Sequence, residues 1–295
     1  MIIANIIGGL GNQMFQYACA RAITKELKMP LKVTQDMFGV YSSHYGPELE
    51  RVFSLSLDVA QPVELQKMIG MLRVSPLIRR VLASRFLTLL RGRYFIVEPH
   101  FRYWDELYDR AQAGGYLQGY WQSERYFARH TNIIRKDFEF KNKFNEQNKE
   151  LVREIRKTNS ISVHVRHGDY VKNAKTYSVH GICTPEYYFE AIEFLEQQVS
   201  NIRLFAFSDD HKWVAEVLKS RYPELVLVDH NRGGESYNDM RLMSFCRHHI
   251  IANSSFSWWG AWLNPAPNKI VIAPRKWFTN GRDSTDLVPD TWIRL

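Results

Sequence analysis

The sequence contains few cysteines and no long apolar run. Its three cysteines, Cys19, Cys183 and Cys246, are far apart and odd in number. They argue against a disulfide framework and a CxxC metal site, and they favour a reducing compartment. Residues 1–7 lack a basic stretch before the first glycine, which argues against a signal peptide, and no later apolar run is long enough to span a membrane. We therefore expect a cytoplasmic protein.

Acidic residues are also scarce relative to basic ones, with 31 Asp and Glu against 39 Lys and Arg and a net charge of +8. This excess favours an anionic partner: a phosphorylated substrate, a membrane surface or nucleic acid. Hydrophobic residues make up 45% and charged residues 24% of the 295 residues, which is typical of a globular protein and argues against disorder. The length is sufficient for two domains of about 150 residues each.

The amino-terminal half begins with a β-turn-α-β pattern. A buried strand over residues 1–7 is followed by a glycine turn, a helix that begins at Asn12 and a second strand over residues 31–34. Residues 35–115 show less regular periodicity. The polar segment of residues 141–149 is the best linker candidate. We therefore expect an amino-terminal domain of residues 1–145 and a carboxyl-terminal domain of residues 146–295.

The carboxyl-terminal half alternates between short apolar runs and helical patterns. Strands of this kind, separated by helices, argue for a parallel sheet with right-handed crossovers. Two such halves predict a two-lobed α/β protein with a cleft. The expected strands of this half cover residues 161–166, 203–207, 225–228, 250–252 and 270–273.

The expected strand over residues 161–166 ends in a cluster of polar side chains: His164, Arg166, His167 and Asp169. In open α/β sheets the carboxyl ends of the strands face the ligand crevice. A guanidinium there is suited to a phosphate, because it is permanently charged and its donors match phosphate oxygens. The alternative is a salt-bridged arginine and a hydrogen-bonded histidine in a surface turn, and the segment alone leaves both open.

A glycine-rich turn, Gly8-Gly9-Leu10-Gly11-Asn12-Gln13, lies between the first strand and the first helix. Glycines allow close backbone approach to a ligand, and a helix start presents free N–H groups to an anion. The turn is not a dinucleotide fingerprint, because Met14 stands where the third glycine is needed, and no GK[ST] follows to make a P-loop. A purely structural turn is the alternative.

Ser208, Asp209 and Asp210 follow the expected strand over residues 203–207. Paired carboxylates could hold a divalent metal beneath a nucleotide diphosphate. Capping of the next helix is the favoured interpretation, because serine and aspartate satisfy free N–H groups in a first turn. We therefore expect no metal site.

A serine- and tryptophan-rich segment, Asn253-Ser254-Ser255-Phe256-Ser257-Trp258-Trp259, also lies between a strand and a helix. Its hydroxyls and helix-start amides could bind phosphate oxygens, and its aromatic rings could stack on a base or sugar. For Trp258, Trp259 and Trp262 we favour core packing.

Residues 73–93 carry six arginines and no acidic residue. Apolar residues interleave with them at roughly helical spacing, and a basic amphipathic segment can lie on an anionic membrane surface. The favoured alternative is a solvated helix face. The membrane hypothesis would bring the protein close to a lipid-linked substrate. The arginines are Arg73, Arg79, Arg80, Arg85, Arg91 and Arg93.

Together these motifs resemble the bacterial α-1,2-fucosyltransferases of glycosyltransferase family 11. The resemblance runs in the same order through residues 8–18, 164–170, 207–210, 239–244 and 253–259, and it includes the closing residues 273–278. It implies two facing Rossmann-like domains (a GT-B-like fold) with the donor site in the interdomain cleft. Residues 1–145 would then form the acceptor-side domain and residues 146–295 the GDP-fucose-binding domain. It also implies inversion at the anomeric carbon, no obligatory metal and no cofactor, since GDP-fucose is a substrate.

The resemblance also implies roles for individual residues. Arg166 would hold the β-phosphate with Ser255 and the backbone of Ser254 and Phe256. His164 and Asp239 would hold guanine or ribose. Gly11, Asn12 and Gln13 would approach the pyrophosphate from the other domain. The residues expected to take part in catalysis are Arg166, His167 and Asp169.

One position departs from the family pattern. The family usually has a second arginine where this chain has His167. The substitution removes a permanent charge beside the leaving group or replaces it with a titratable one. The general base stays open among His167, Asp169 and Asp36, and a loose transition state with late proton loss would need no strong base.

The expected function is transfer of L-fucose from GDP-fucose to the 2-hydroxyl of a terminal β-galactoside, either an O-antigen unit, with its lipid carrier, or a lactose-type oligosaccharide. Two alternatives stay open: fucosyl transfer in another linkage or to protein, and a basic nucleic-acid-binding protein. The second lacks zinc-finger spacing and an aromatic RNA-binding signature, so we expect no nucleic-acid partner. An NAD oxidoreductase is weaker still, given Met14.

Overall fold

The computed structural model describes residues 1–39, 45–168, 177–179 and 181–295, apart from the side chains of Leu72, Arg73 and Arg85. The chain divides into two compact units. Unit 1 comprises Met1–Asn142 and Thr285–Leu287, and unit 2 comprises Lys143–Ser284 and Val288–Leu295. The predicted boundary lay after residue 145. The sequence did not predict that Thr285–Leu287 belong to unit 1.

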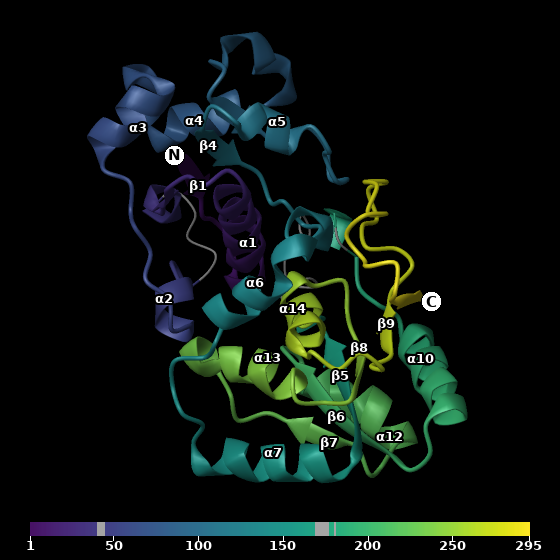
Figure 1. The fold of residues 1–295 in the computed structure, drawn as a ribbon. Coiled ribbons are helices and arrows are strands. Elements are labelled where there is room, and N and C mark those ends of the chain that lie inside the picture. The colour runs from purple at the N-terminus through teal and green to yellow at the C-terminus, as the bar shows by residue number, and fades with distance from the viewer. Residues whose placement is uncertain (40–44, 169–176, 180) are drawn as a thin grey trace. The chain divides into compact units, whose positions relative to one another are not determined.

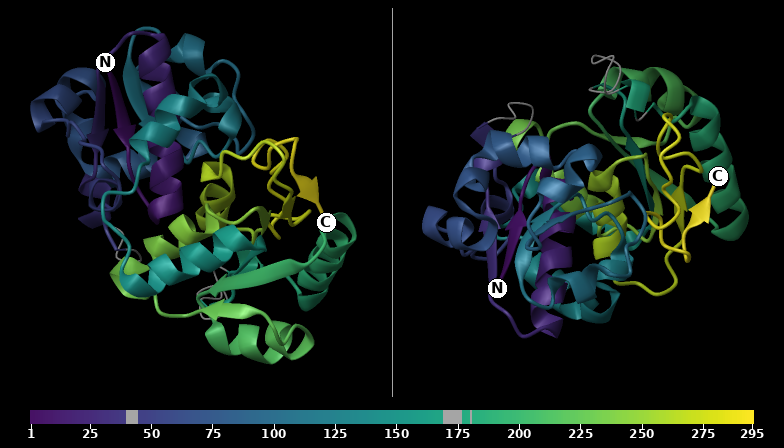
Figure 2. Two further views of the ribbon diagram at one scale, coloured as in Figure 1. Left: turned by 60° about the horizontal axis from the view of Figure 1, so that its bottom comes forward. Right: turned by 90° about the horizontal axis from the view of Figure 1, so that it is seen from above.

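Unit 1 is built on a four-stranded parallel sheet in the order β2-β1-β4-β3 (Figures 1 and 2). The first crossover is the helix α1, which begins at Leu10, slightly before the predicted start at Asn12. Its apolar residues, including Phe15 and Ala18, are buried, so the helix forms much of the core of this unit. The elements are β1 (Ile2–Asn5), α1 (Leu10–Glu26), β2 (Leu31–Thr34), β3 (Phe95–Val97) and β4 (Gly115–Gln118).

The segment between β2 and β4, where the sequence showed no clear pattern, consists mainly of short helices. Each covers eight residues or fewer, which is too short for a helical period to be recognised. They are η1 (Asp36–Gly39), α2 (Leu49–Val52), α3 (Pro62–Ile69), η2 (Met71–Val74), α4 (Pro76–Leu82), η3 (Arg85–Leu90) and α5 (Leu107–Ala111); η4 (Glu124–Tyr126), η5 (Ala128–His130) and α6 (Thr131–Asp137) follow β4.

Unit 2 contains a six-stranded parallel sheet in the order β10-β9-β8-β5-β6-β7. The five predicted strands are present, although β8 begins and ends two residues before the predicted range, and the two-residue β10 was missed. The strands are β5 (Asn159–Val165), β6 (Ile202–Ser208), β7 (Val226–Val228), β8 (His248–Ile250), β9 (Val271–Ala273) and β10 (Ile293–Arg294).

The helices of unit 2 follow the predicted alternation, with one correction. The polar segment proposed as a linker runs into α7, because the side chain of Asn145 accepts the backbone N–H of Asn148 at 2.9 Å and caps that helix. The helices are α7 (Glu146–Lys157), α10 (Pro185–Gln198), α11 (His211–Trp213), the π-turn η6 (Val214–Leu218), α12 (Lys219–Arg221), η7 (Gly233–Glu235), α13 (Tyr237–Met243) and α14 (Ser255–Leu263).

The central strand β5 is buried on both faces. Ile161, Val163 and Val165 pack into the main hydrophobic cluster of unit 2. The alternate residues are polar: the hydroxyl of Ser162 lies 2.8 Å from Nδ1 of His249 in the interior. Side chains two residues apart share a face of a strand, so His164 follows Ser162 on this polar face.

No helix in the described residues is long and apolar enough to cross a membrane.

Candidate active site

The predicted donor-site residues of unit 2 gather at one edge of its sheet. The adjacent parallel strands β6, β5 and β8 run in the same direction, so the residues that follow them meet at their carboxyl ends. This is the edge at which open α/β sheets bind ligands. The three segments are Arg166–His167, Asp209–Asp210 and Asn253–Ser255.

Arg166 is oriented by a neighbouring carboxylate. Its Nη1 lies 3.3 Å from Oδ2 of Asp209, and the side chain keeps 28% of its surface exposed. The other oxygen, Oδ1, accepts the backbone N–H groups of His167 and Gly168 at 2.9 and 3.0 Å. A Cβ atom on Gly168 would lie 2.9 Å from the carbonyl oxygen of Asp209, so glycine permits this close approach. The salt bridge considered from the sequence is therefore present, but it leaves the guanidinium partly exposed at the ligand edge.

His167 is held by the next acid in the chain. Its Nδ1 lies 2.9 Å from Oδ2 of Asp210, and its ring stacks on Trp213 with centroids 5.4 Å apart. Asp210 also caps α11, where its Oδ1 accepts the backbone N–H of Trp213 at 3.1 Å. This backbone hydrogen bond, with the His167 contact, lowers the pKa of Asp210. With Nδ1 engaged, Nε2 is the ring nitrogen that remains for a ligand.

The Ser208-Asp209-Asp210 segment caps the helix that follows it, as the sequence predicted. Ser208 Oγ accepts the backbone N–H of Asp210 at 2.9 Å, and Asp210 forms the N-cap of α11. Both carboxylates already engage neighbouring cationic or N–H groups. Within the described ranges, no group of three or more His, Cys, Asp or Glu side chains is arranged to hold a metal ion.

His164 is a buried imidazole beside two other predicted site residues. Its ring centroid lies 5.8 Å from that of Phe256. Burial, and then the positive charge of Arg166, lower the pKa of His164 to about 3, so the ring is neutral at physiological pH. Among the residues that the structure describes, Nδ1 of His164 has no hydrogen-bond partner. A buried polar atom of this kind is uncommon, and a ligand hydrogen bond would satisfy it.

The Asn253–Trp259 segment divides into a polar start and an apolar body. Ser254 is the N-cap of α14, and its hydroxyl accepts the backbone N–H of Phe256 at 3.3 Å. The first turn of this nine-residue helix contains no acidic side chain, so its positive end is not neutralised from within. Trp258, Trp259 and Trp262 are buried and pack on one another, which confirms the core-packing interpretation.

Asp239 lies in a buried polar network that the sequence did not reveal. Its Oδ1 accepts from Nδ2 of Asn231 at 2.8 Å. Asn231 and Asn148 exchange two hydrogen bonds at 2.8 and 3.1 Å, and His230 lies 2.8 Å from the same amide of Asn148. Burial raises the pKa of Asp239 to about 7, although the Asn231 hydrogen bond opposes the shift. His230 and Asn231 directly follow β7, so they could have been predicted, as Arg166 was, from their position after a parallel strand. Asn148 lies on α7, and no sequence pattern indicated its role.

The glycine turn in unit 1 is held by its own side chains. Nε2 of Gln13 donates to the carbonyls of Gly8 and Gly46 at 2.8 and 2.9 Å, and Oε1 accepts the N–H of Glu48 at 2.9 Å. The side-chain carbonyl of Asn12 accepts from Gln122 at 2.7 Å. Gln13 therefore shapes the turn. The donor-binding roles of Gly11, Asn12 and Gln13 stay predictions.

Asp36 follows β2 and pairs with the buried guanidinium of Arg79. Arg79 also lies 5.3 Å from the ring centroid of Tyr116. This corrects the sequence interpretation of residues 73–93 as a uniformly basic face, because Arg79 points into unit 1. Asp169, the other carboxylate considered as a base, lies outside the described residues.

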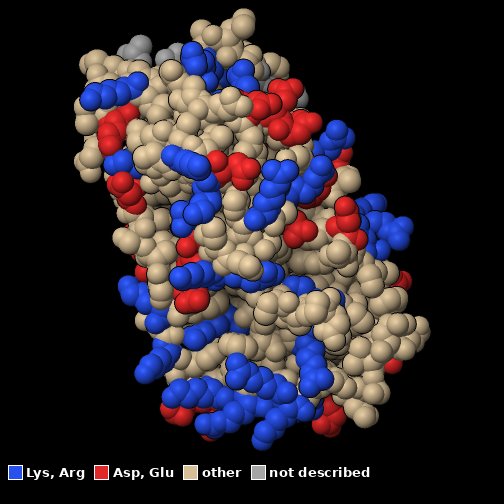
Figure 3. All heavy atoms as spheres, viewed as in Figure 1, with Lys and Arg blue, Asp and Glu red and all other residues tan. Residues whose placement is uncertain are grey.

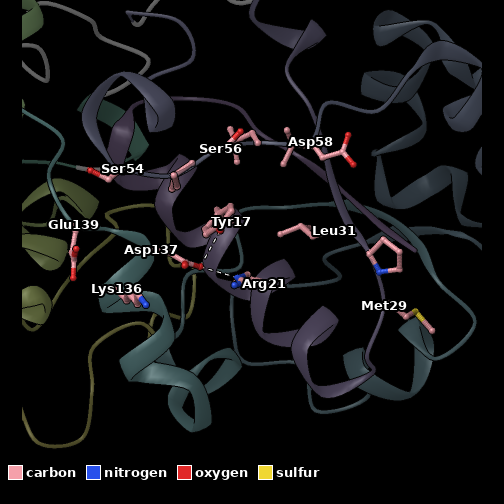
Figure 4. A pocket seen from close by; sticks show the side chains of 14 residues that line it. Tyr17, Arg21, Met29, Leu31, Ser54, Ser56, Asp58, Lys136, Asp137 and Glu139 are labelled. Atoms are coloured by element: carbon pink, nitrogen blue, oxygen red, sulfur yellow. Dashed lines mark hydrogen bonds and ion pairs between the residues drawn. The ribbon is translucent and has the colours of Figure 1, made fainter.

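A separate pocket in unit 1, with a volume of about 540 Å³, is lined by residues near the amino end of β2 (Figure 4). Oδ2 of Asp137 accepts from the hydroxyl of Tyr17 at 3.0 Å and from Nε of Arg21 at 2.8 Å. None of the predicted site residues lines this pocket. We therefore do not assign this pocket to the donor site.

The chain is similar in sequence to known glycosyltransferases. The chain is 35% identical to an α-1,2-colitosyltransferase of Escherichia coli over 100% of its length and 99% of the relative. It is 34% identical to the E. coli O-antigen biosynthesis glycosyltransferase WbnK, with 98% of each chain covered. It is also 23% identical to galactoside α-(1,2)-fucosyltransferase 2 of Hylobates lar, over 88% of this chain and 68% of the relative.

A solved structure gives the same fold. The α-1,6-fucosyltransferase NodZ from Bradyrhizobium, soaked with GDP-fucose, has a TM-score of 0.57 and 16% sequence identity, with 90% of this chain and 92% of that chain covered. The predicted fold class, two Rossmann-like α/β units of GT-B type, is confirmed; the interdomain position of the donor site stays a prediction. The model of the family "Glycosyl transferase family 11" matches residues 1–295. The chain therefore belongs to glycosyltransferase family 11.

Proposed function

We propose that this glycosyltransferase transfers L-fucose from GDP-fucose, with inversion, to the 2-hydroxyl of a terminal β-galactoside. The observation that carries the proposal is the group formed by Arg166, His164 and the start of α14 at one edge of the unit 2 sheet. The names of relatives support the α-1,2 linkage and the galactoside acceptor. The GDP-fucose named for the NodZ structure supports the donor. Family membership argues against the nucleic-acid-binding alternative.

In this proposal Arg166 stabilises the departing GDP. As a galactose hydroxyl attacks the anomeric carbon, the bond to the β-phosphate oxygen breaks and negative charge grows on that oxygen. A guanidinium held by Asp209, with the backbone N–H of Ser255 at the start of α14, is oriented before the charge develops. Groups fixed in this way stabilise the transition state more than the ground state.

His164 and Asp239 hold the nucleoside in this scheme. The neutral His164 ring can accept or donate one hydrogen bond through its unpartnered nitrogen. The Asp239 carboxyl can accept from the N–H groups of guanine or the hydroxyls of ribose, and Asn231 keeps it in place. The proposal also gives Gly11 and Asn12 a role toward the pyrophosphate, with Gln13 shaping the turn that carries them.

His167 acts as a second cationic donor toward the leaving group. In the imidazolium form of His167 both ring nitrogens donate, so Nδ1 can pair with Asp210 while Nε2 donates to the leaving group. The position thus reproduces, in titratable form, the charge of the family's usual arginine. The proton of the acceptor hydroxyl leaves late in a loose transition state, and Asp36 and Asp169 are the carboxylates to test as its acceptor.

The acceptor we propose is an O-antigen unit on a lipid carrier, in line with the relative named for O-antigen biosynthesis. Such an acceptor would be met at a membrane surface, on the cytoplasmic side if the expected location is correct. A lactose-type oligosaccharide is its soluble counterpart in an assay.

A second donor needs a direct test, because one relative is named as a colitosyltransferase. Colitose lacks one hydroxyl of fucose, so the two donors differ little in shape. The purified chain is incubated with GDP-fucose or GDP-colitose and a panel of β-galactosides, and the linkage of each product is determined by NMR. Fucose on the 2-hydroxyl of galactose supports the proposal. Transfer of colitose alone, or fucose on another hydroxyl, contradicts it.

A further inference from the structure

Large apolar side chains are exposed on one short segment of unit 1. Of the twelve exposed large hydrophobic residues in the described part of the chain, seven lie between residues 71 and 90. The three elements that carry them, η2, α4 and η3, are in contact through α4. The seven residues are Met71, Leu77, Ile78, Val81, Phe86, Leu89 and Leu90.

The helix α4 has an inverted distribution of polarity. Arg79 is completely buried, whereas Leu77 and Val81 are each 60% exposed. A helix on the surface of a protein in water normally turns its cations outward and its aliphatic residues inward. The orientation is fixed from within, because Arg79 pairs with Asp36 and Leu82 packs into the cluster that contains Phe95. The aliphatic face therefore points outward as part of the fold.

The following segment η3 extends this apolar surface. Phe86 is 81% exposed and Leu89 is fully exposed. The end of α4 beneath them is closed by Arg91, which donates to the carbonyls of Leu82, Ala83 and Ser84 at 2.7, 3.1 and 2.7 Å. These bonds satisfy the last carbonyls of α4 and hold η3 in place beside it.

The charges carried by this segment itself have a single sign. Residues 71–93 contain six arginines and no aspartate or glutamate. Arg79 and Arg91 are engaged within unit 1, and Arg80 and Arg93 have exposed side chains. Figure 3 shows a mainly tan surface in the region of α3 and α4, with scattered blue side chains and some red ones at its side. The segment thus combines exposed apolar side chains with exposed arginines.

We propose that this docking face, defined by Leu77, Val81, Phe86, Leu89 and Leu90 with Arg80 and Arg93, binds the surface of an anionic bilayer. The apolar side chains enter the boundary between headgroups and acyl chains, and the arginines meet lipid phosphates. A symmetric contact between two copies of the chain would place the same exposed arginines against each other. An anionic lipid surface removes that repulsion, so the charge selects the bilayer.

The docking face deepens the proposed function, since a lipid-linked acceptor is presented at a bilayer, and it rests on that function only in this respect. Vesicle binding requires neither donor nor acceptor sugar. A failure of vesicle binding therefore leaves the transfer reaction testable, and the reverse also holds.

The test is sedimentation of the full chain with vesicles of phosphatidylcholine, with and without phosphatidylglycerol. We expect binding to the anionic vesicles and at least tenfold weaker binding to phosphatidylcholine alone. Each arginine near the surface contributes about fivefold in affinity, so Arg80→Gln/Arg93→Gln should weaken binding by about 25-fold. Phe86→Ser/Leu89→Ser should weaken it by at least tenfold without changing the charge.

The matched control is Lys149→Gln/Arg153→Gln on α7. This pair removes the same charge from a helix of unit 2 that carries none of the exposed large hydrophobic residues found in the described ranges. It should keep most of the vesicle binding. All variants should transfer sugar to a soluble β-galactoside at the parent rate, because none alters the candidate active site.

Three results would overturn the docking face. In the first, Phe86→Ser/Leu89→Ser binds anionic vesicles as tightly as the parent. In the second, the α7 control loses as much binding as the arginine variant. In the third, the parent forms a dimer in solution that the Phe86→Ser/Leu89→Ser pair abolishes while vesicle binding persists.

Discussion

The Nη1 atom of Arg166 lies 3.3 Å from Oδ2 of Asp209, while the other oxygen of that carboxylate accepts two backbone N–H groups of the following turn. One acid thus fixes both the direction of the guanidinium and the shape of the loop that carries it. An arginine held in this way can meet a phosphate without first being ordered, which is the condition for effective electrostatic catalysis.

Arg166→Ala should lower kcat by about 100- to 1000-fold, the range found when a preorganised donor is removed. Asp209→Asn is the matched variant: it keeps an oxygen for the two backbone N–H groups but loses the charge that orients Arg166, so we expect a smaller loss. Steady-state kinetics with GDP-fucose measures both, and circular dichroism checks the fold. An Arg166→Ala enzyme with the parent kcat would refute the assignment.

His167→Arg should retain activity within about tenfold of the parent, because it replaces a titratable cation by a permanent one at the leaving group. His167→Gln, which is neutral, should lose about 10- to 100-fold, less than the loss expected for Arg166→Ala, because Arg166 stays in place. The measurement is kcat of both variants across the pH range in which histidine titrates. If His167→Arg were as inactive as Arg166→Ala, His167 would have to act as the base instead.

Two separate buried groups, His164 and Asp239, should make the free energy of unfolding change with pH in opposite directions. The pKa of His164 is lowered from 6.5 to about 3, so its contribution to the free energy of unfolding is complete above pH 6.5 and is lost as pH falls toward 3. The pKa of Asp239 is raised from 3.8 to about 7, so its contribution is present below pH 3.8 and is lost as pH rises toward 7.

Each group changes the free energy of unfolding by at most about 1.4 kcal/mol per pH unit. The two changes largely cancel over the pH range in which both groups titrate. Relative to the parent, Asp239→Asn should gain stability as pH rises through the overlap, and His164→Gln should lose it. Urea unfolding of the three proteins at several pH values measures the difference. Three parallel curves would show that neither group is shifted in the folded protein.

Asp36→Ala should lower the free energy of unfolding by about 1–3 kcal/mol, because it leaves the buried Arg79 guanidinium without its partly exposed carboxylate. Asp36→Ala/Arg79→Met should recover much of this loss, since methionine fills the space without a charge. Urea unfolding of the single and double variants measures the cost of the unpaired guanidinium. Equal losses in the two proteins would mean that the unpaired guanidinium carries no cost. Asp36→Asn, which retains an acceptor for Arg79, is the variant for testing a role in proton transfer.

The sequence predicted the elements in which the local pattern of apolar and polar residues matches their burial in the fold. β5 and β6 are continuous buried runs that end in polar residues, so both the strands and the ligand edge could be recognised. Arg79 shows the limit of this reasoning. An arginine among aliphatic residues predicts an exposed face, and only the carboxylate of Asp36, 43 positions away in the sequence, explains its burial. Asn148 was missed for the same reason, because its partner Asn231 is distant in sequence.

Asp286 accepts from the guanidinium of Arg125 and from the backbone N–H of Tyr103, at 2.8 and 3.0 Å. All three residues belong to unit 1, although Asp286 follows most of unit 2 in the sequence. A ribosome must therefore add residues 143–284 to the chain before unit 1 can acquire these two hydrogen bonds. Synthesis of the amino-terminal part of unit 1 thus precedes its final cross-link by more than one hundred residues.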